Sequence, residues 1–196
     1  RIDPQKTAFT GSTAIELAFE GAHDHLWLDT HQLEIAKATL SVGAVEHRVE
    51  VVAGDDYHTG FRWKGALDAP DGAKLVIDFS GVIADTEFQG VFRQKDEEGR
   101  LYVFTQFESI HARDAFPGFD EPSFKFPYQI TLEVPKDQLA FSNMPVAEEA
   151  IDGELKRVTF AEKPDRHEEG GHTREQREKD YEEAGGVERL SHRGDS

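Results

Sequence analysis

Runs of alternating apolar and polar residues, separated by turn signals, fill the chain as far as Phe160. Thr13 to Phe19 alternates with the period of two that is typical of a half-buried strand. Similar runs lie at Leu26 to Leu28, Leu33 to Leu40, Val49 to Val52, Phe61 to Trp63, Leu75 to Phe79, Gly90 to Arg93, Leu101 to Phe107, Tyr128 to Val134 and Arg157 to Phe160. The turn signals are Gly54-Asp55-Asp56, Asp71-Gly72, Glu98-Gly99 and Asp152-Gly153. Many short strands with such turns predict an all-β fold, an antiparallel multi-sheet sandwich, with one helical turn at Ile110 to Ala115.

The composition changes abruptly after Pro164. Residues 165–196 contain only four apolar side chains, too few to offset the entropy lost on ordering such a segment. We therefore divide the chain into a β domain at residues 1–164 and a polar, charged tail or linker at residues 165–196. The tail could be partly helical from Arg174 to Glu183, because Thr173 and Gln176 form a capping-box pattern.

The formal charge of −17, from 39 acidic and 22 basic residues, disfavours whole classes of partner. A field of this sign repels phosphate, so we expect no nucleic-acid binding and no docking to an anionic membrane. The chain has no cysteine, which excludes disulfides and thiolate metal sites. No apolar run reaches the roughly 20 residues of a membrane helix, and no export signal is visible, so a cytoplasmic location is expected.

Four short motifs follow one another in the second half of the β region: TQFE at 105–108, ARDAFPGFDEP at 112–122, ITLEVP at 130–135 and SNMP at 142–145. In this order they resemble the amino-terminal domain of the aminopeptidase N-like zinc metallopeptidases. The chain lacks the zinc motif of that family, H-E-x-x-H on a helix, which supplies two histidines and a glutamate. The sequence is therefore similar to one part of an enzyme.

The resemblance implies a saddle-like β domain that packs over a zinc catalytic domain and donates the TQFE segment to its active site. Glu108 would then hold the free α-amino group of a peptide N-terminus, and Gln106 would help to line the pocket for the first side chain. A carboxylate that faces an ammonium in a water-poor cleft forms a short, charge-assisted hydrogen bond, and an internal peptide has no ammonium to offer. The residues alone leave another interpretation open, in which Gln106 and Glu108 merely share one face of an exposed strand.

The ARDAFPGFDEP stretch is predicted to be structural. It turns sharply twice, and an arginine fork can clamp the carboxylates that follow the turn. We therefore assign Arg113, Asp120, Glu121 and Pro122 to the architecture of this loop. The family most often has cysteine where this chain has Gly118, a difference that removes one small side chain.

The histidines do not form a convincing metal site. His23 and His25 could share a strand face near His31, but such a cluster is usually a solvated turn. His167 and His172 are five residues apart instead of four, so on a helix they diverge by about 140°. We therefore predict no metal ligand and no cofactor in this chain, with zinc bound only in the complete enzyme. No nucleophile elbow, P-loop or dinucleotide motif is present.

Three interpretations follow. The leading one is a non-catalytic amino-terminal domain, inactive alone, whose partners in the complete enzyme are the zinc catalytic domain and peptide N-termini. The second is a stand-alone β-sandwich interaction module that descends from such a domain and has no peptidase activity. The third is a small zinc hydrolase that uses the tail histidines, and their spacing disfavours it.

Overall fold

The computed structural model describes residues 1–121, 124 and 126–163, and within these ranges the chain is almost entirely β. The tail, its expected helix and Pro122 lie outside the described residues. The elements are β1 (Ala8–Asp29), β2 (Leu33–Val42), β3 (Val45–Ala53), β4 (His58–Val82), β5 (Gly90–Lys95), β6 (Leu101–Gln106), the 3₁₀ helix η1 (Ala112–Asp114), β7 (Thr131–Pro135), β8 (Val146–Asp152) and β9 (Leu155–Phe160). All their strand pairs are antiparallel, which confirms the predicted multi-sheet all-β class.

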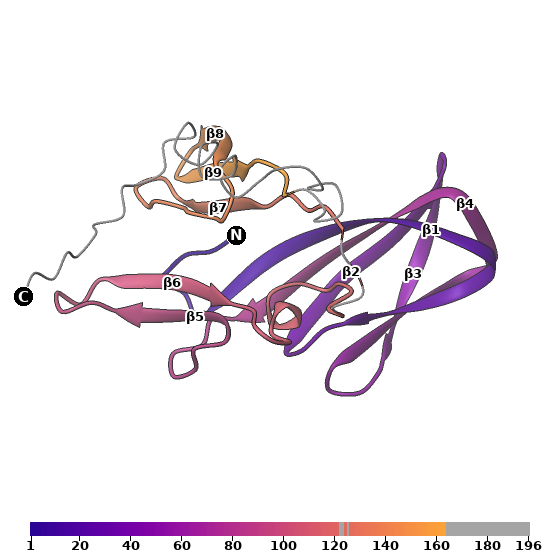
Figure 1. Cartoon of the computed structure of the whole chain (residues 1–196), viewed down its shortest axis with the longest axis horizontal. Helices are drawn as coiled ribbons and strands as arrows, with labels where there is room; N and C mark the ends of the chain where they lie inside the picture. Colours follow the sequence, from indigo (N-terminus) through magenta and orange to yellow (C-terminus); the bar gives the residue numbers. More distant parts are fainter. Residues whose placement is uncertain (122–123, 125, 164–196) are drawn as a thin grey trace, which may run out of the picture.

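The first four strands form one sheet in the order β1-β4-β2-β3. The 25-residue strand β4 organises it, because its second half pairs with β2 and its first half pairs with β3. The 22-residue strand β1 follows β4 along both halves. Figure 1 shows this long, twisted sheet on one side of the molecule, with the remaining elements on the other. A strand that changes partners in this way curls the sheet around its own core.

Two predicted boundaries are wrong in this sheet. The turn predicted at Asp71-Gly72 lies inside β4, where a register shift between Leu17 and Phe19 of β1 lets both strands continue past it. Irregularities of this kind bend a strand without ending it. For the same reason the separate runs predicted along β1 and β4 are parts of two long strands.

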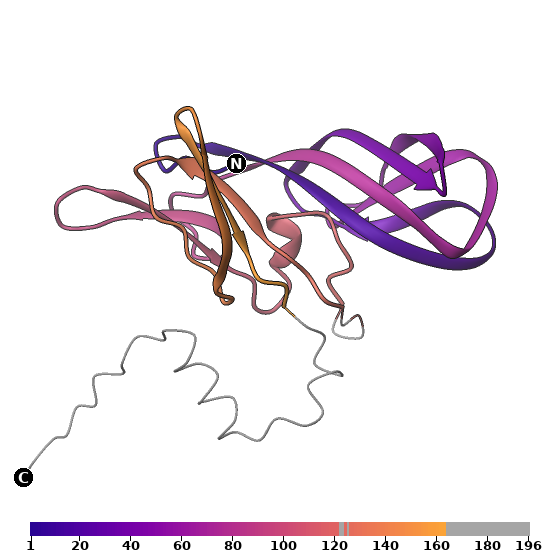
Figure 2. The same ribbon diagram turned by 90° about the horizontal axis from the view of Figure 1, so that it is seen from above.

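The second half of the chain forms two smaller sheets. Strands β5 and β6 make a two-stranded hairpin, and β7, β9 and β8 make a three-stranded sheet in that order. Figure 1 shows them one above the other, and Figure 2, turned by 90°, shows the three-stranded sheet crossing over the hairpin. The turns predicted at Glu98-Gly99 and Asp152-Gly153 are confirmed as the bends of the β5–β6 and β8–β9 hairpins.

The largest apolar core lies in the four-stranded sheet, where Leu40, Phe61, Leu75 and Ile77 are fully buried. A second cluster joins that sheet to the hairpin and η1; its buried members are Phe9, Phe79, Ile83, Val91 and Ala115. No helix in the described part of the chain is long and apolar enough to cross a membrane.

Residues 1–7 run between the three sheets and bond to each of them. The Ile2 amide donates to the Glu133 carbonyl of β7 (2.8 Å), and the Ile83 amide at the end of β4 donates to the Thr7 carbonyl (2.9 Å). Arg93 of β5 donates to the carbonyls of Pro4 (3.1 Å) and Lys6 (2.8 Å). Arg93 also hydrogen-bonds the Asp85 carboxylate, which lowers the pKa of Asp85. This opening segment therefore ties the sheets together.

Candidate functional site

The two residues predicted to bind substrate lie where β6 ends. Gln106 is the last residue of β6 and pairs with Gly90 of β5. Glu108 follows two residues later, and between them Phe107 packs against the second apolar cluster and edge-on to Phe116, with ring centroids 5.8 Å apart. The inward position of Phe107 leaves its two neighbours exposed. The end of one strand thus presents an amide and a carboxylate side by side.

Glu108 is an exposed carboxylate whose side chain makes no ion pair or hydrogen bond within residues 1–121, 124 and 126–163. Its backbone amide donates a hydrogen bond to the Gln106 Oε1 atom at 3.2 Å. The loop is then closed by the His111 amide, which donates to the Phe107 carbonyl at 2.9 Å. An exposed, unpaired carboxylate on a loop whose backbone is held in this way can accept hydrogen bonds from a cationic ligand.

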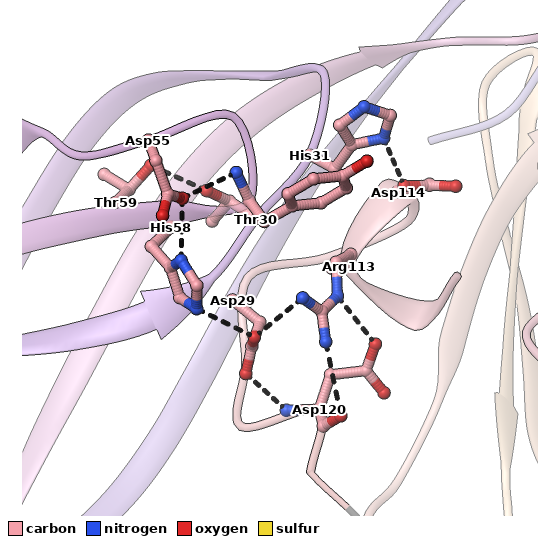
Figure 3. A network of polar contacts seen from close by, with 10 residues as sticks. Asp29, Thr30, His31, Asp55, His58, Thr59, Arg113, Asp114 and Asp120 are labelled. Carbon is pink, nitrogen blue, oxygen red and sulfur yellow. Dashed lines mark hydrogen bonds and ion pairs between the residues drawn. The ribbon is translucent and has the colours of Figure 1, made fainter. Parts of the chain in front are cut away.

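Behind this loop, Arg113 joins three segments of the chain. Its Nη1 atom lies 3.0 Å from Asp29 Oδ1 at the end of β1, and its Nε atom lies 3.1 Å from Asp120 Oδ2. The Asp120 amide in turn donates to Asp29 Oδ2 at 2.8 Å (Figure 3). The Arg113 side chain is only 11% exposed and that of Asp29 only 10%. The network is therefore a partly buried clamp that fixes the turn after η1 to the large sheet.

The sequence pattern predicts Arg113 and Asp120 but not Asp29, which is 91 residues from Asp120. The only sequence signal for Asp29 is that it directly follows the apolar run Leu26 to Leu28. Asp29 also lies 3.6 Å from His58 Nε2, and His58 Nδ1 bonds Asp55 at 2.7 Å. Glu121 is exposed beside this network.

The position of Gly118 has room for a side chain. Its amide and carbonyl form a two-way bridge with Asp29, at 3.2 and 2.8 Å. A Cβ added there would meet only the Phe116 ring, at 3.7 Å, an ordinary van der Waals contact. The glycine is therefore not required by packing.

The described residues contain no group of three or more His, Cys, Asp or Glu side chains that could hold a metal ion. His25 bonds its neighbour Asp24 at 2.7 Å, and His31 turns away to bond Asp114, also at 2.7 Å. The histidine pair at His167 and His172 lies outside the described residues.

Comparison with known families identifies the family of the chain. The model of the peptidase M1 N-terminal domain matches residues 1–166, so this chain belongs to that family as the N-terminal part of an M1 aminopeptidase. The match covers every strand and the Gln106–Glu108 segment.

The individual relatives are named as aminopeptidases. The chain is 33% identical over 167 residues to aminopeptidase M1-C of Oryza sativa subsp. japonica, covering 84% of this chain and 19% of that protein. It is 34% identical over 163 residues to endoplasmic reticulum aminopeptidase 1 of Homo sapiens, covering 79% and 16%. It is 31% identical over 166 residues to aminopeptidase N of Acetobacter pasteurianus, covering 83% and 46%. The chain thus spans less than half the length of each of these relatives.

Proposed function

We propose that this chain is the non-catalytic amino-terminal domain of a zinc aminopeptidase, in which it anchors the free α-amino group of a peptide whose first residue is removed. The observation that carries the proposal is the exposed, unpaired Glu108 carboxylate, whose backbone amide is bonded to the Gln106 side chain where β6 ends. Family membership supports it, because the M1 relatives are aminopeptidases.

In this proposal the chemistry is divided between two domains. Glu108 accepts hydrogen bonds from the substrate ammonium and so orients the peptide, while Gln106 borders the space for the first side chain. Zinc and its general base would belong to the catalytic domain of the complete enzyme, where the metal would supply an activated water for peptide hydrolysis. The domain described here supplies orientation and specificity for a free N-terminus, and alone it is inactive.

The first test uses the chain alone. We expect elemental analysis of the purified chain to find no bound zinc, and a panel of aminoacyl chromogenic amides to show no turnover. Zinc near one equivalent per chain, with turnover that a chelator abolishes, would contradict the proposal. The tail residues His167, Glu168 and His172 would then be the first to mutate.

The second test uses a full-length enzyme that contains this domain. Glu108→Gln keeps the size of the side chain but removes its charge, so kcat/KM for peptides with a free N-terminus should fall roughly ten- to a hundredfold, the value of a charge-assisted hydrogen bond. Glu97→Gln in the β5–β6 turn removes another exposed carboxylate and should have no effect. Equal activity of the two variants would contradict the role of Glu108.

A second candidate function rests on the β5–β6 hairpin. Phe92 stacks on Phe104 and contacts Phe88 edge-on, both at 5.8 Å between ring centroids, and Phe88 is 63% and Phe104 46% exposed. Within the described residues β6 pairs only with β5, so its outer edge is open to a second copy of the chain. If the chain acts as a stand-alone module, sedimentation velocity should show a dimer that Phe88→Ser and Phe104→Ser together dissociate. A monomer at all concentrations would exclude this function.

A further inference from the structure

Asp114 links two histidines that come from distant parts of the chain. Its Oδ1 atom lies 2.7 Å from Nδ1 of His31, in the turn between β1 and β2, and its Oδ2 atom lies 2.8 Å from Nδ1 of His111. The three side chains are between 18% and 25% exposed, so water competes only partly for these bonds. Figure 3 shows the contact of Asp114 with His31 beside the Arg113 network. One carboxylate therefore satisfies both imidazoles.

The same aspartate sits directly against the strand pair that ends at Gln106. Gly90, the partner of Gln106 across the hairpin, has no side chain, and a Cβ there would lie 2.6 Å from Cβ of Asp114. The absence of that one carbon lets η1 approach the hairpin. Asp114 thus lies at the junction of η1, the end of the hairpin and the β1–β2 turn.

Backbone hydrogen bonds connect the two histidines to the Glu108 loop and to η1. The His111 amide closes the Glu108 loop on the Phe107 carbonyl (2.9 Å), and the His31 amide donates to the Arg113 carbonyl (2.9 Å). The His31 ring also stacks on Tyr57, with centroids 5.1 Å apart. Through Asp114, the loop that carries Glu108 is therefore fastened to the turn between β1 and β2 of the four-stranded sheet.

We propose that Asp114, bonded to His31 and His111, is a positioning residue that holds the Glu108 loop at a fixed place against the large sheet. What the fixed carboxylate then binds rests on the function proposed above. The fastening itself is a property of the chain and can be tested without substrate. None of the three side chains is assigned to touch the peptide.

The test compares two substitutions of His31, a residue outside the loop. His31→Leu keeps an apolar side chain against Tyr57 but removes the donor to Asp114, whereas His31→Asn keeps a donor near the Nδ1 position. Amide hydrogen exchange measured by NMR should show faster exchange at His111 in the leucine variant, by about tenfold or more, and recovery in the asparagine variant. Amides of Leu75 and Ile77 in the core serve as the internal standard for folding.

Two further variants control the result. Asp114→Ala should accelerate exchange at His111 as strongly as His31→Leu, while keeping the Cβ that packs over Gly90. Asp24→Ala breaks an exposed histidine–aspartate pair of the same 2.7 Å length and should leave the loop unchanged. Unchanged His111 exchange in both His31→Leu and Asp114→Ala, with the core amides intact, would overturn the inference.

The full-length enzyme separates this inference from the function that it deepens. A displaced carboxylate should raise KM for peptides with a free N-terminus in His31→Leu, and His31→Asn should restore it. Loosening of the loop without any effect of Glu108→Gln on activity would support the fastening and contradict the anchoring function. A loss of activity in Glu108→Gln with no loosening in either His31→Leu or Asp114→Ala would overturn the fastening alone.

Discussion

The two halves of this domain are held together by different means. Most of the buried apolar side chains belong to β1–β4, whereas most of the exposed large ones, such as Phe88, Phe104 and Phe141, follow Val82. The first half has long strands and the largest apolar core, whereas the second has short strands and is joined to the first in part by the ion pairs of Arg113 with Asp29 and Asp120. The difference indicates that the first half is the scaffold and the second is a surface whose loops are positioned by directed polar contacts.

The most direct test of this difference between the halves removes one aromatic ring from each and compares the loss of stability. Phe61→Ala in the four-stranded core, where the side chain is 0% exposed, should lower the free energy of unfolding by about 4 kcal/mol. Phe104→Ala, at 46% exposure on the hairpin, should cost less than about 1 kcal/mol. Urea unfolding followed by tryptophan fluorescence measures both. Similar losses in the two variants would show that the hairpin contributes a core of its own.

Breaking the polar clamp of Arg113 with Asp29 and Asp120 should give the second largest loss of stability. Arg113→Met should lower the free energy of unfolding by about 3 kcal/mol, because it leaves the nearly buried Asp29 without its cation. Adding Asp29→Asn should restore part of this loss, since the unpaired charge is then gone.

Arg100→Met at the exposed hairpin turn is the matched control, because its side chain is 67% exposed and bonds Asp96 in solvent. Thermal unfolding of the three variants decides the point. Equal midpoints for Arg113→Met and Arg100→Met would mean that the clamp does not stabilise the second half.

Two glycines of the hairpin, Gly90 and Gly99, test how much the close contact between β5 and η1 matters for stability. Gly90→Ala should cost about 2 kcal/mol, since the residue has φ +64° and its new Cβ would meet Asp114 at 2.6 Å. Gly99→Ala, with φ +82° and nothing within 4 Å, carries the backbone strain alone and should cost less. Chemical unfolding measures the difference. If the two costs were the same, the close approach of η1 to β5 would be unimportant.

The smallest effect concerns the three-stranded sheet. The hydrogen bond from Arg157 to Glu133 lowers the pKa of Glu133 from its ordinary 4.5. A lowered pKa contributes stability that is present above pH 4.5 and is lost as the pH falls through the folded-state value. Arg157→Gln should therefore raise the Glu133 pKa in an NMR titration and slightly lower the unfolding temperature at pH 7, with a smaller difference near pH 3. Lys136→Gln, which removes another exposed pair, should leave that pKa in place.

The sequence predicts these two halves unequally. Period-two alternation identifies the strands of the core sheet because one face of each is buried. It does not identify β8, since every residue from Val146 to Asp152 is exposed and nothing alternates. It also divides β1 and β4 into pieces, because glycine and aspartate inside a bulged strand have the composition of a turn.

The sequence also predicts only those parts of the candidate site that are close together along the chain. The strand pattern and the motif place Gln106 and Glu108 together at the end of β6, a relation between neighbours in sequence. Asp29, His31 and Gly90 reach the site from distant segments, and no local pattern records such contacts. Burial periodicity is a local signal, whereas these pairings depend on the assembled sheets.

Residues 1–7, which bond to all three sheets, impose an order in time on the folding of the domain. The ribosome makes Ile2 long before Glu133, yet the amide of the first meets the carbonyl of the second only when β7 exists. Contacts so far apart in sequence form slowly, because a long loop must close before they stabilise anything. Residues 1–7 are thus among the last of the described residues to reach their native places, and until they do the three sheets lack the segment that bonds to all of them.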